Sequence, residues 1–293
     1  MSLAEWTWIT AARVRRKLRG RTSREDDHAA RSAWIRAHVP GRSFVDVGGL
    51  YGINGDIAFQ AAAAGASPVT CFDAGDPTPE FLERRASTGL DVRIVQGDLE
   101  DPLSVERIGA HDVVWCSGVV YHTPNPVQQL IHLRRICRET LYLGSHTMAE
   151  VPGVKQACVF YPYLPEGSRR VHESPHWQAA GSGAGSIGGP FIDAPMLGHN
   201  NFWWGITPSA LEAMVRTACF EVVERIENHS SPWFTELVCK PVDRLPTQPP
   251  FDFFRKRAEA RAAGVEPPPF DGSAYDGLLA PPPDPAVDDA PPS

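Results

Sequence analysis

Short apolar runs alternate with longer segments of mixed polarity over residues 44–145 of this chain of 293 residues. The apolar runs are rich in β-branched residues, which is typical of strands buried in a sheet. We expect strands at 44–47, 68–73, 92–96, 111–117 and 139–145. The segments between them are predicted to be helical, and one helix would begin at Pro126, with Asn125 as its N-cap, and include Cys137. Strands that alternate with helices indicate a parallel, doubly wound α/β sheet of the Rossmann-like type.

The pattern changes beyond this region. Residues 147–205 show no regular periodicity over a length that favours an inserted, substrate-binding lid, and the alternative is a surface excursion. A helix from Pro208 and strands at 220–226 and 235–240 are then expected, and the two strands would close the sheet as an antiparallel pair. We therefore expect three parts, which are a helical cap over 1–40, a main domain over 41–242 and a Pro-rich, partly disordered tail over 243–293.

The composition excludes several classes of protein. The net charge of −7 argues against a protein whose main task is to grip nucleic acid. No apolar run approaches the roughly 18 residues of a membrane span, and residues 1–10 lack the pattern of a secretory signal, so a cytoplasmic protein without a membrane partner is expected. The six cysteines are scattered without a C-x-x-C pair, which indicates reduced core residues and no metal site.

A basic run near the start of the chain stands out against the acidic total. One interpretation is an arm that touches RNA or an anionic substrate, and the other is the solvated face of a helix. We favour the solvated face. The run comprises Arg13, Arg15, Arg16, Lys17, Arg19, Arg21 and Arg24.

A glycine-rich turn connects the first strand to the helix that follows it. Asp46, Gly48 and Gly52 form the spacing D-x-G-x-x-x-G, which is neither a phosphate-binding loop nor the dinucleotide pattern G-x-G-x-x-G. Glycine lets the backbone approach a ligand closely, and the start of the helix offers unpaired N–H groups. The turn resembles the first motif of the class I S-adenosylmethionine (SAM) methyltransferases. The alternative is a tight strand-to-helix turn without a ligand.

Acidic residues follow the next two strands. Asp73 stands where it would accept hydrogen bonds from ribose hydroxyls, although a turn aspartate is the alternative. Asp98 and Leu99 match the position that contacts adenine in the methyltransferase family, or else belong to an ordinary loop. Over residues 40–145 the chain thus resembles a class I methyltransferase, which implies SAM as cofactor and S-adenosylhomocysteine (SAH) as product. The resemblance assigns to the cofactor Asp46, Gly48, Gly49, Tyr51, Gly52, Asn54, Asp73, Ala74, Asp98, Leu99, Cys116 and Ser117.

The segment Gly118-Val119-Val120-Tyr121-His122, followed by Pro126, resembles the G-V-[LV]-Y-H-x-x-x-P segment of the branch of tRNA-wobble-uridine carboxymethyltransferases and natural-product methyltransferases. The match is short, so it does not transfer the tRNA substrate. His122 is the candidate general base because an unperturbed imidazole titrates near neutrality, and the alternative is a histidine that orients the cofactor. The residues expected to contact the substrate are Tyr121, His199, Asn200, Trp203 and Trp204.

The aromatic content of residues 147–205 and the acidic total favour a small-molecule acceptor. We expect SAM-dependent methyl transfer, at a hydroxyl group, in specialised natural-product metabolism. Two alternatives remain, which are an RNA-modifying methyl- or carboxymethyltransferase and a non-catalytic SAM-binding module. Nothing in the sequence indicates the identity of the acceptor or the oligomeric state.

Overall fold

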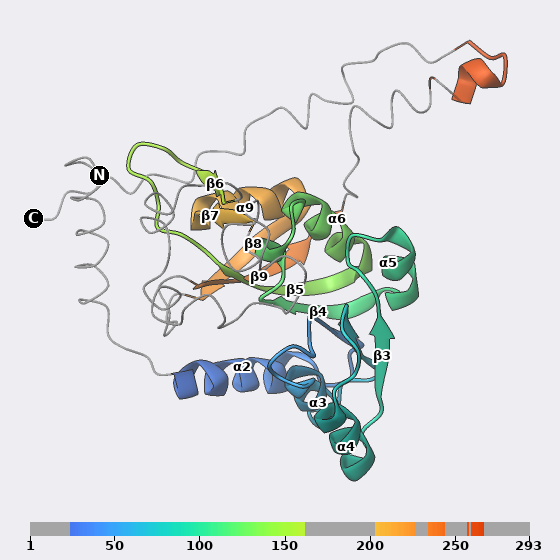
Figure 1. Cartoon of the computed structure of the whole chain (residues 1–293), viewed down its shortest axis with the longest axis vertical. Helices are drawn as coiled ribbons and strands as arrows, with labels where there is room; N and C mark the ends of the chain where they lie inside the picture. Colours follow the sequence, from blue (N-terminus) through green and yellow to red (C-terminus); the bar gives the residue numbers. More distant parts are fainter. Residues whose placement is uncertain (1–23, 162–202, 227–233, 244–256, 258, 267–293) are drawn as a thin grey trace, which may run out of the picture. The chain divides into compact units, whose positions relative to one another are not determined.

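The computed structural model describes residues 24–161, 203–226, 234–243, 257 and 259–266. The chain divides into two compact units, residues 1–246 and residues 247–293. All elements discussed below belong to the first unit. Its described part is a sheet with helices on both faces (Figure 1).

Seven strands form the sheet in the order β3-β2-β1-β4-β5-β9-β8. The strands β1 to β5 pair in parallel, and β9 runs antiparallel to both β5 and β8. This arrangement confirms the expected Rossmann-like fold class with its C-terminal antiparallel pair. The strands are β1 (Phe44–Val47), β2 (Val69–Asp73), β3 (Val92–Gln96), β4 (His111–Ser117), β5 (Cys137–His146), β8 (Phe220–Ile226) and β9 (Phe234–Pro241).

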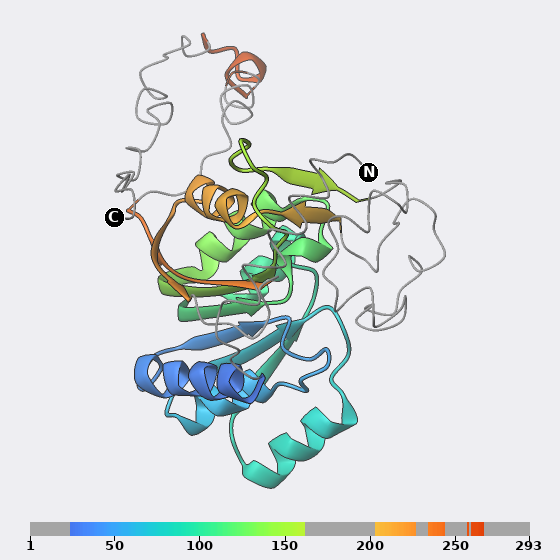
Figure 2. The same ribbon diagram turned by 90° about the vertical axis from the view of Figure 1, so that its left-hand side faces the viewer.

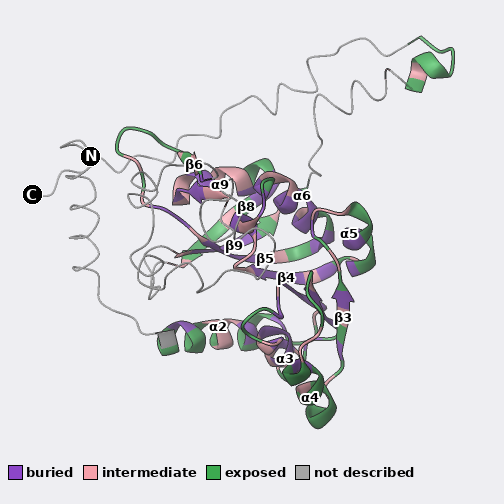
Figure 3. Cartoon of the chain, in the orientation of Figure 1, coloured by how far each residue is buried: buried purple, intermediate pink, exposed green. Residues whose placement is uncertain are grey.

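The described helices cover the two faces of the sheet in groups, as Figures 1 and 2 show. One group is α2 (Arg24–His38), α3 (Asp56–Ala63) and α4 (Pro79–Thr88). The other group is α5 (Pro102–Ile108), α6 (Pro126–Ile136) and α9 (Pro208–Thr217). Successive side chains of a strand enter different cores. Val114 packs with the second group and Trp115 with the first, which explains why the central strands are apolar throughout (Figure 3).

The sequence misplaces the junction around α6. Asn125 makes no side-chain cap, and its Nδ2 atom donates to Oε2 of Glu100 at 3.1 Å. Cys137 does not belong to the helix but begins β5 directly, so helix and strand join without a loop. The helix between β3 and β4 is the short α5, which Asp101 caps.

Part of the segment 147–205 forms a second, small sheet. In it β6 (Cys158–Phe160) pairs antiparallel with β7 (Trp204–Ile206). Cys158 is exposed there, so the prediction that all six cysteines lie in the core is wrong for this one and right for the other five. Residues 162–202 lie outside the described residues, and the lid therefore stays a prediction. Within the described part of the chain, no helix is both long and apolar enough to traverse a bilayer.

Candidate active site

The carboxyl ends of the parallel strands bring the predicted cofactor residues to one edge of the sheet. The register places Val47 of β1 between Phe72 of β2 and Cys116 of β4. Asp73, the last residue of β2, pairs with Gln96 of β3 on the other side of β2. The glycine turn, Asp73, the loop at Asp98 and the end of β4 therefore lie along a single edge, where open α/β sheets bind their ligands.

The glycine turn is close to its supporting strands. Gly48 has φ +79°, and its N–H donates to the carbonyl of Phe72 at 2.8 Å. A Cβ atom on Gly49 would overlap the carboxyl group of Asp46 and lie 2.8 Å from Cys71 Sγ. Gly52 has φ +72°, but a Cβ atom there would meet nothing within 4 Å. Steric space thus requires glycine at position 49, whereas backbone conformation favours it at position 52.

Asp46 lies beneath this turn and is 1% exposed. Its carboxylate accepts a hydrogen bond from the backbone N–H of Ala58 in the first turn of α3. Asp46 thus provides an acceptor that Gly55, at the N-cap, cannot provide because it has no side chain. Its Oδ2 atom has no hydrogen-bond partner within the described residues. Burial, reinforced by the charge of Asp73, raises the pKa of Asp46 to about 8. This carboxyl group therefore holds its proton at neutral pH and supports the turn from below.

Asp73 uses both carboxylate oxygens to shape the edge. Oδ2 accepts from the N–H of Leu50 at 2.8 Å, and Oδ1 accepts from the N–H of Gly75 at 2.9 Å. The role of a turn aspartate is therefore realised. Each carboxylate oxygen has a further lone pair, so contact with ribose hydroxyls is compatible with these bonds and stays a prediction. The next residue, Ala74, is exposed and accepts a hydrogen bond from the side chain of Gln96 at 3.3 Å.

The loop after β3 is held from within the protein. Oδ1 of Asp98 accepts from the N–H of Glu100 at 2.8 Å, which is the geometry of a loop aspartate. Leu99 is 4% exposed, and its carbonyl lies 2.6 Å from Nδ1 of His132. The adenine contact predicted for Asp98 and Leu99 is neither supported nor opposed by these bonds.

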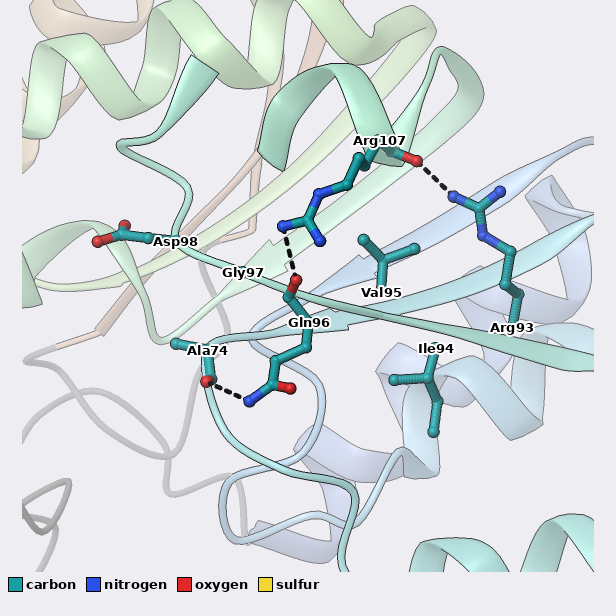
Figure 4. Close-up of a pocket in the computed structure, with 8 residues that line it drawn as sticks. All are labelled: Ala74, Arg93, Ile94, Val95, Gln96, Gly97, Asp98 and Arg107. Atoms are coloured by element: carbon teal, nitrogen blue, oxygen red, sulfur yellow. Dashed lines mark hydrogen bonds between the residues drawn. The ribbon is translucent and has the colours of Figure 1, made fainter. Parts of the chain in front are cut away.

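An open depression of about 770 Å³ runs along β3 up to this loop (Figure 4). Arg107 donates to the carbonyl of Gln96 at 2.9 Å, and Arg93 donates to the carbonyl of Arg107 at 2.5 Å. Both guanidinium groups therefore support the edge strand. The lining residues are Ala74, Arg93, Ile94, Val95, Gln96, Gly97, Asp98 and Arg107. Because Ala74 and Asp98 are among them, one end of the depression coincides with the predicted adenine position.

The remaining predicted cofactor residues are spread over the turn and the end of β4. Tyr51 is 53% exposed beside the equally exposed Gly52, and Asn54 has a left-handed backbone with φ +48°. Cys116 is fully buried, and burial raises the pKa of its thiol above the usual range. Ser117, which ends β4, is partly buried. Tyr51 and Ser117 are thus accessible to a ligand at the edge, whereas the Cys116 side chain belongs to the core.

A cluster of rings follows the ends of β4 and β5. The short 3-10 helix η1 (Val120–His122) carries Tyr121, whose ring centroid lies 4.2 Å from that of His122. His146, the last residue of β5, packs edge-on to Tyr121 at 4.9 Å and to Phe234 at 5.2 Å. Sequence reasoning missed His146. The signal available was its position at the end of a strand that neighbours β4.

Two tryptophans, Trp203 just before β7 and Trp204 at its start, approach η1 and the loop that follows it. The N–H of Trp203 donates to the carbonyl of Tyr121 at 3.1 Å. The indole N–H of Trp204 donates to the carbonyl of Pro124, also at 3.1 Å. Three of the five predicted substrate residues therefore come together, namely Tyr121, Trp203 and Trp204. The other two, His199 and Asn200, lie outside the described residues.

No group of three His, Cys, Asp or Glu side chains in the described residues is arranged to hold a metal ion. The glycine turn and the acidic residues at the strand ends form a set that fits an organic ligand with an amino group and hydroxyl groups. This is the chemistry of the SAM molecule.

Comparison with known proteins agrees with this chemistry. Residues 45–143 match the family model described as a methyltransferase domain. A tRNA U34 carboxymethyltransferase from Chromohalobacter salexigens is 29% identical over 157 residues, which are 47% of this chain and 43% of that protein. The chain therefore spans less than half the length of this curated relative.

Several solved structures are also similar. The 1,6-didemethyltoxoflavin-N1-methyltransferase of Burkholderia thailandensis is 16% identical, with 73% of this chain and 77% of that chain covered and a TM-score of 0.48. The magnesium protoporphyrin IX methyltransferase of Synechocystis PCC 6803 is also 16% identical, with 81% and 93% covered and a TM-score of 0.45.

The sheet order, the glycine turn at the end of β1 and the family match over residues 45–143 point in one direction. They confirm the resemblance that the motifs indicated, and with it SAM as the cofactor. Residues 45–143 of this chain are therefore a methyltransferase domain, in a sheet of the class I, SAM-dependent type.

Proposed function

We propose that this protein transfers a methyl group from SAM to a hydroxyl group of a small molecule, in natural-product metabolism. The observation that carries the proposal is the cluster of rings formed by Tyr121, His122 and His146. This cluster follows the end of β4, next to the strand ends that carry the predicted cofactor residues. Aromatic rings combined with a few polar groups are typical of small-molecule sites. An imidazole beside such a surface is suited to proton transfer.

SAM, when bound, would supply a methyl group from its sulfonium, and the neutral thioether of SAH would be the leaving group. On this proposal Asp73 and Asp98 would hold the ribose and adenine ends, because carboxylates accept hydrogen bonds from hydroxyl and amino groups. Asp46, buried beneath Gly49, would support the glycine turn from below, and the turn would face the amino-acid end of the cofactor. These contacts fix the cofactor along the edge of the sheet, which reduces the entropic cost of a near-attack arrangement.

His122 would remove the proton from the acceptor hydroxyl as the new O–C bond forms. Neutral imidazole is the effective form of such a base near pH 7. The neighbouring Tyr121 is buried, and burial raises the pKa of its phenol above the usual range, so Tyr121 stays protonated and cannot serve as the base. The side chains of His122 and His146 flank this ring.

An RNA acceptor is the second candidate, since the curated relative over 157 residues is a tRNA carboxymethyltransferase. The basic run that would contact RNA, from Arg13 to Arg24, falls almost entirely outside the described residues. The net charge of −7 opposes this candidate. We therefore propose a small molecule as partner, and nucleic acid as the alternative.

The deciding experiment offers methyl-labelled SAM with either a set of phenols and hydroxylated ring compounds or total tRNA. Wild type is compared with a variant deleted through residue 24. Labelled small-molecule product with both proteins supports the proposal. Labelled tRNA that depends on residues 1–24, bound with an affinity that falls steeply with salt, contradicts it, since each neutralised phosphate adds about −0.7 to the slope of log K against log salt.

A further inference from the structure

Two loops at the ligand edge are joined by one side chain. Glu100 lies in the loop after β3, two residues beyond Asp98, and its backbone N–H donates to Asp98 Oδ1. Its carboxylate reaches across to the loop that follows η1. There Oε1 accepts from the hydroxyl of Thr123, and Oε2 accepts from Nδ2 of Asn125 at 3.1 Å. Thr123, at 2% exposed, immediately follows His122.

The loop after η1 is itself tied to the acceptor side. The N–H of Asn125 donates to Oγ1 of Thr123 at 2.9 Å, which closes a compact turn around Pro124. The carbonyl of Pro124 accepts the indole N–H of Trp204. Hydrogen bonds therefore run without a break from Asp98, through Glu100 and the turn, to Trp204 of β7.

The rear of the adenine-side loop is anchored to α6. The carbonyl of Leu99 lies 2.6 Å from Nδ1 of His132, which is 1% exposed, and Nε2 of His132 lies 2.7 Å from the side chain of Gln128. The backbone at Leu99 is thus fixed by α6. A ligand that orders Asp98 can therefore affect only the opposite side of the loop, where the Glu100 side chain extends.

Asn125 shows that this connection overrides local preference. It occupies the N-cap position of α6, where an asparagine side chain normally accepts a hydrogen bond from the helix. Here it donates to Glu100 instead, and α6 begins without a side-chain cap. Departures from local rules of this kind are expected where a residue serves the site rather than its own helix.

We propose that Glu100 is a positioning residue that couples occupation of the adenine end of the cofactor site to the orientation of His122. The inference rests on the proposed function, because it needs a ligand with an adenine group at Asp98. When that group orders Asp98 and the adjoining N–H of Glu100, the carboxylate fixes Thr123, and Thr123 fixes the preceding residue. The acceptor side is thereby set only when the cofactor is in place.

The test uses the full chain with histidine labelled for NMR and needs no acceptor. SAH and adenosine are the probes, and the His122 ring signals are identified by their loss in His122→Gln. Two variants cut the connection independently, namely Glu100→Ala at the carboxylate and Thr123→Val at the hydroxyl. Glu106→Ala, on the exposed face of the neighbouring helix α5, is the matched control. Calorimetry measures the affinity of SAH for each protein.

We expect both probes to shift the His122 signals in wild type and in Glu106→Ala. In Glu100→Ala and Thr123→Val the shift should fall to less than about half, while SAH affinity changes by less than about threefold, or roughly 0.7 kcal/mol. An undiminished shift in either folded variant overturns the coupling. A loss of SAH affinity beyond about tenfold with the shift intact also overturns it, because Glu100 would then be a cofactor ligand.

The same measurements separate this inference from the proposed function. Wild type that binds SAH without any response of His122, or that responds to SAH and not to bound adenosine, contradicts the coupling alone. Wild type that binds no SAH contradicts the cofactor site, and the coupling with it.

Discussion

Gly49 lies directly over the carboxyl group of Asp46, so that a Cβ atom on Gly49 would overlap Oδ2 and lie 2.8 Å from the carboxyl carbon. The strand and the turn that follows it are therefore in contact at the point where the chain reverses. The carboxyl group of Asp46 leaves no room for a side chain at position 49, so the two residues constrain each other. Two predictions follow from this contact.

The first is that Gly49→Ala is far more damaging than Gly52→Ala. The methyl group at 49 would meet both Asp46 and Cys71, and overpacking of this kind typically costs about 1–3 kcal/mol. At 52 only the left-handed backbone, at φ +72°, is unfavourable, at a cost of about 1 kcal/mol. Thermal unfolding of the two variants measures the difference. Equal losses of stability would show that the space above Asp46 does not restrict position 49.

The second prediction concerns pH. Because burial raises the pKa of Asp46 from 3.8 to about 8, the folded state holds a proton that the unfolded state releases. This contribution to stability is fully present below about pH 4 and is lost as pH rises toward 8. Asp46→Asn, which cannot ionise, should therefore gain stability over wild type as pH rises, measured by thermal unfolding without cofactor at about pH 5 and about pH 8.

Asp101→Asn is the control for the pH series, because its shift has the opposite sign. The Ser104 hydroxyl and backbone N–H groups lower the pKa of Asp101, so its contribution is present at neutral pH and is lost as pH falls through the depressed value. Its difference from wild type should therefore stay the same at both pH values of the series, because the contribution is lost only below the ordinary carboxyl pKa of 3.8. Parallel curves for wild type and Asp46→Asn across the range would show that Asp46 ionises freely and would remove the argument from burial.

Asp73 gives a prediction on the cofactor. Asp73→Asn keeps the shape of the side chain but removes its charge and one of its two acceptors for the Leu50 and Gly75 N–H groups, and we expect SAM affinity to fall by about 1.5–3 kcal/mol, the range for hydrogen bonds to a charged group. Asp76→Asn is the matched control, since Asp76 lies nearby and bonds only Gln96 in the described contacts, at 3.0 Å. Calorimetry that finds equal affinities in the two variants would remove Asp73 from the cofactor site.

The sequence predicts the central sheet well because its strands are buried on both faces. The bounds of β4 agree with expectation to the residue because it is an apolar run between polar residues, and those of the edge strand β3 agree because its apolar and polar residues alternate. It fails where a distant partner decides. Asn125 looks like a helix cap, yet Glu100 takes its side chain, and β6 and β7 have three residues each, too short for a periodic pattern.

The site divides in the same way. The strand ends reveal Asp46, Asp73 and Asp98, because parallel strands bring their carboxyl ends to one edge. That Asp46 is buried with an oxygen unpaired among the described residues depends on Gly49 and Cys71, which only folding brings together. His146 was missed for the same reason. Its neighbours Tyr121 and Phe234 come from other parts of the chain, so no local pattern marks it.

The last prediction separates the two histidines of the ring cluster. If His122 is the general base, His122→Gln should lower turnover by about 10²–10⁴-fold while the affinity for SAH stays within about threefold. His146 forms a wall of the same cluster, so His146→Gln should raise the KM for the acceptor and leave kcat within about tenfold. In wild type, kcat/KM should fall in acid, because imidazolium cannot accept a proton, and this limb should vanish in His122→Gln. The measurement is initial rates across pH with a methylated phenol as product.

The reverse pattern, in which His146→Gln abolishes the chemical step and the acid limb, would transfer the role of base to His146. Retention of turnover and of the acid limb in both variants would exclude both imidazoles, and the ring cluster would then serve only to bind the acceptor.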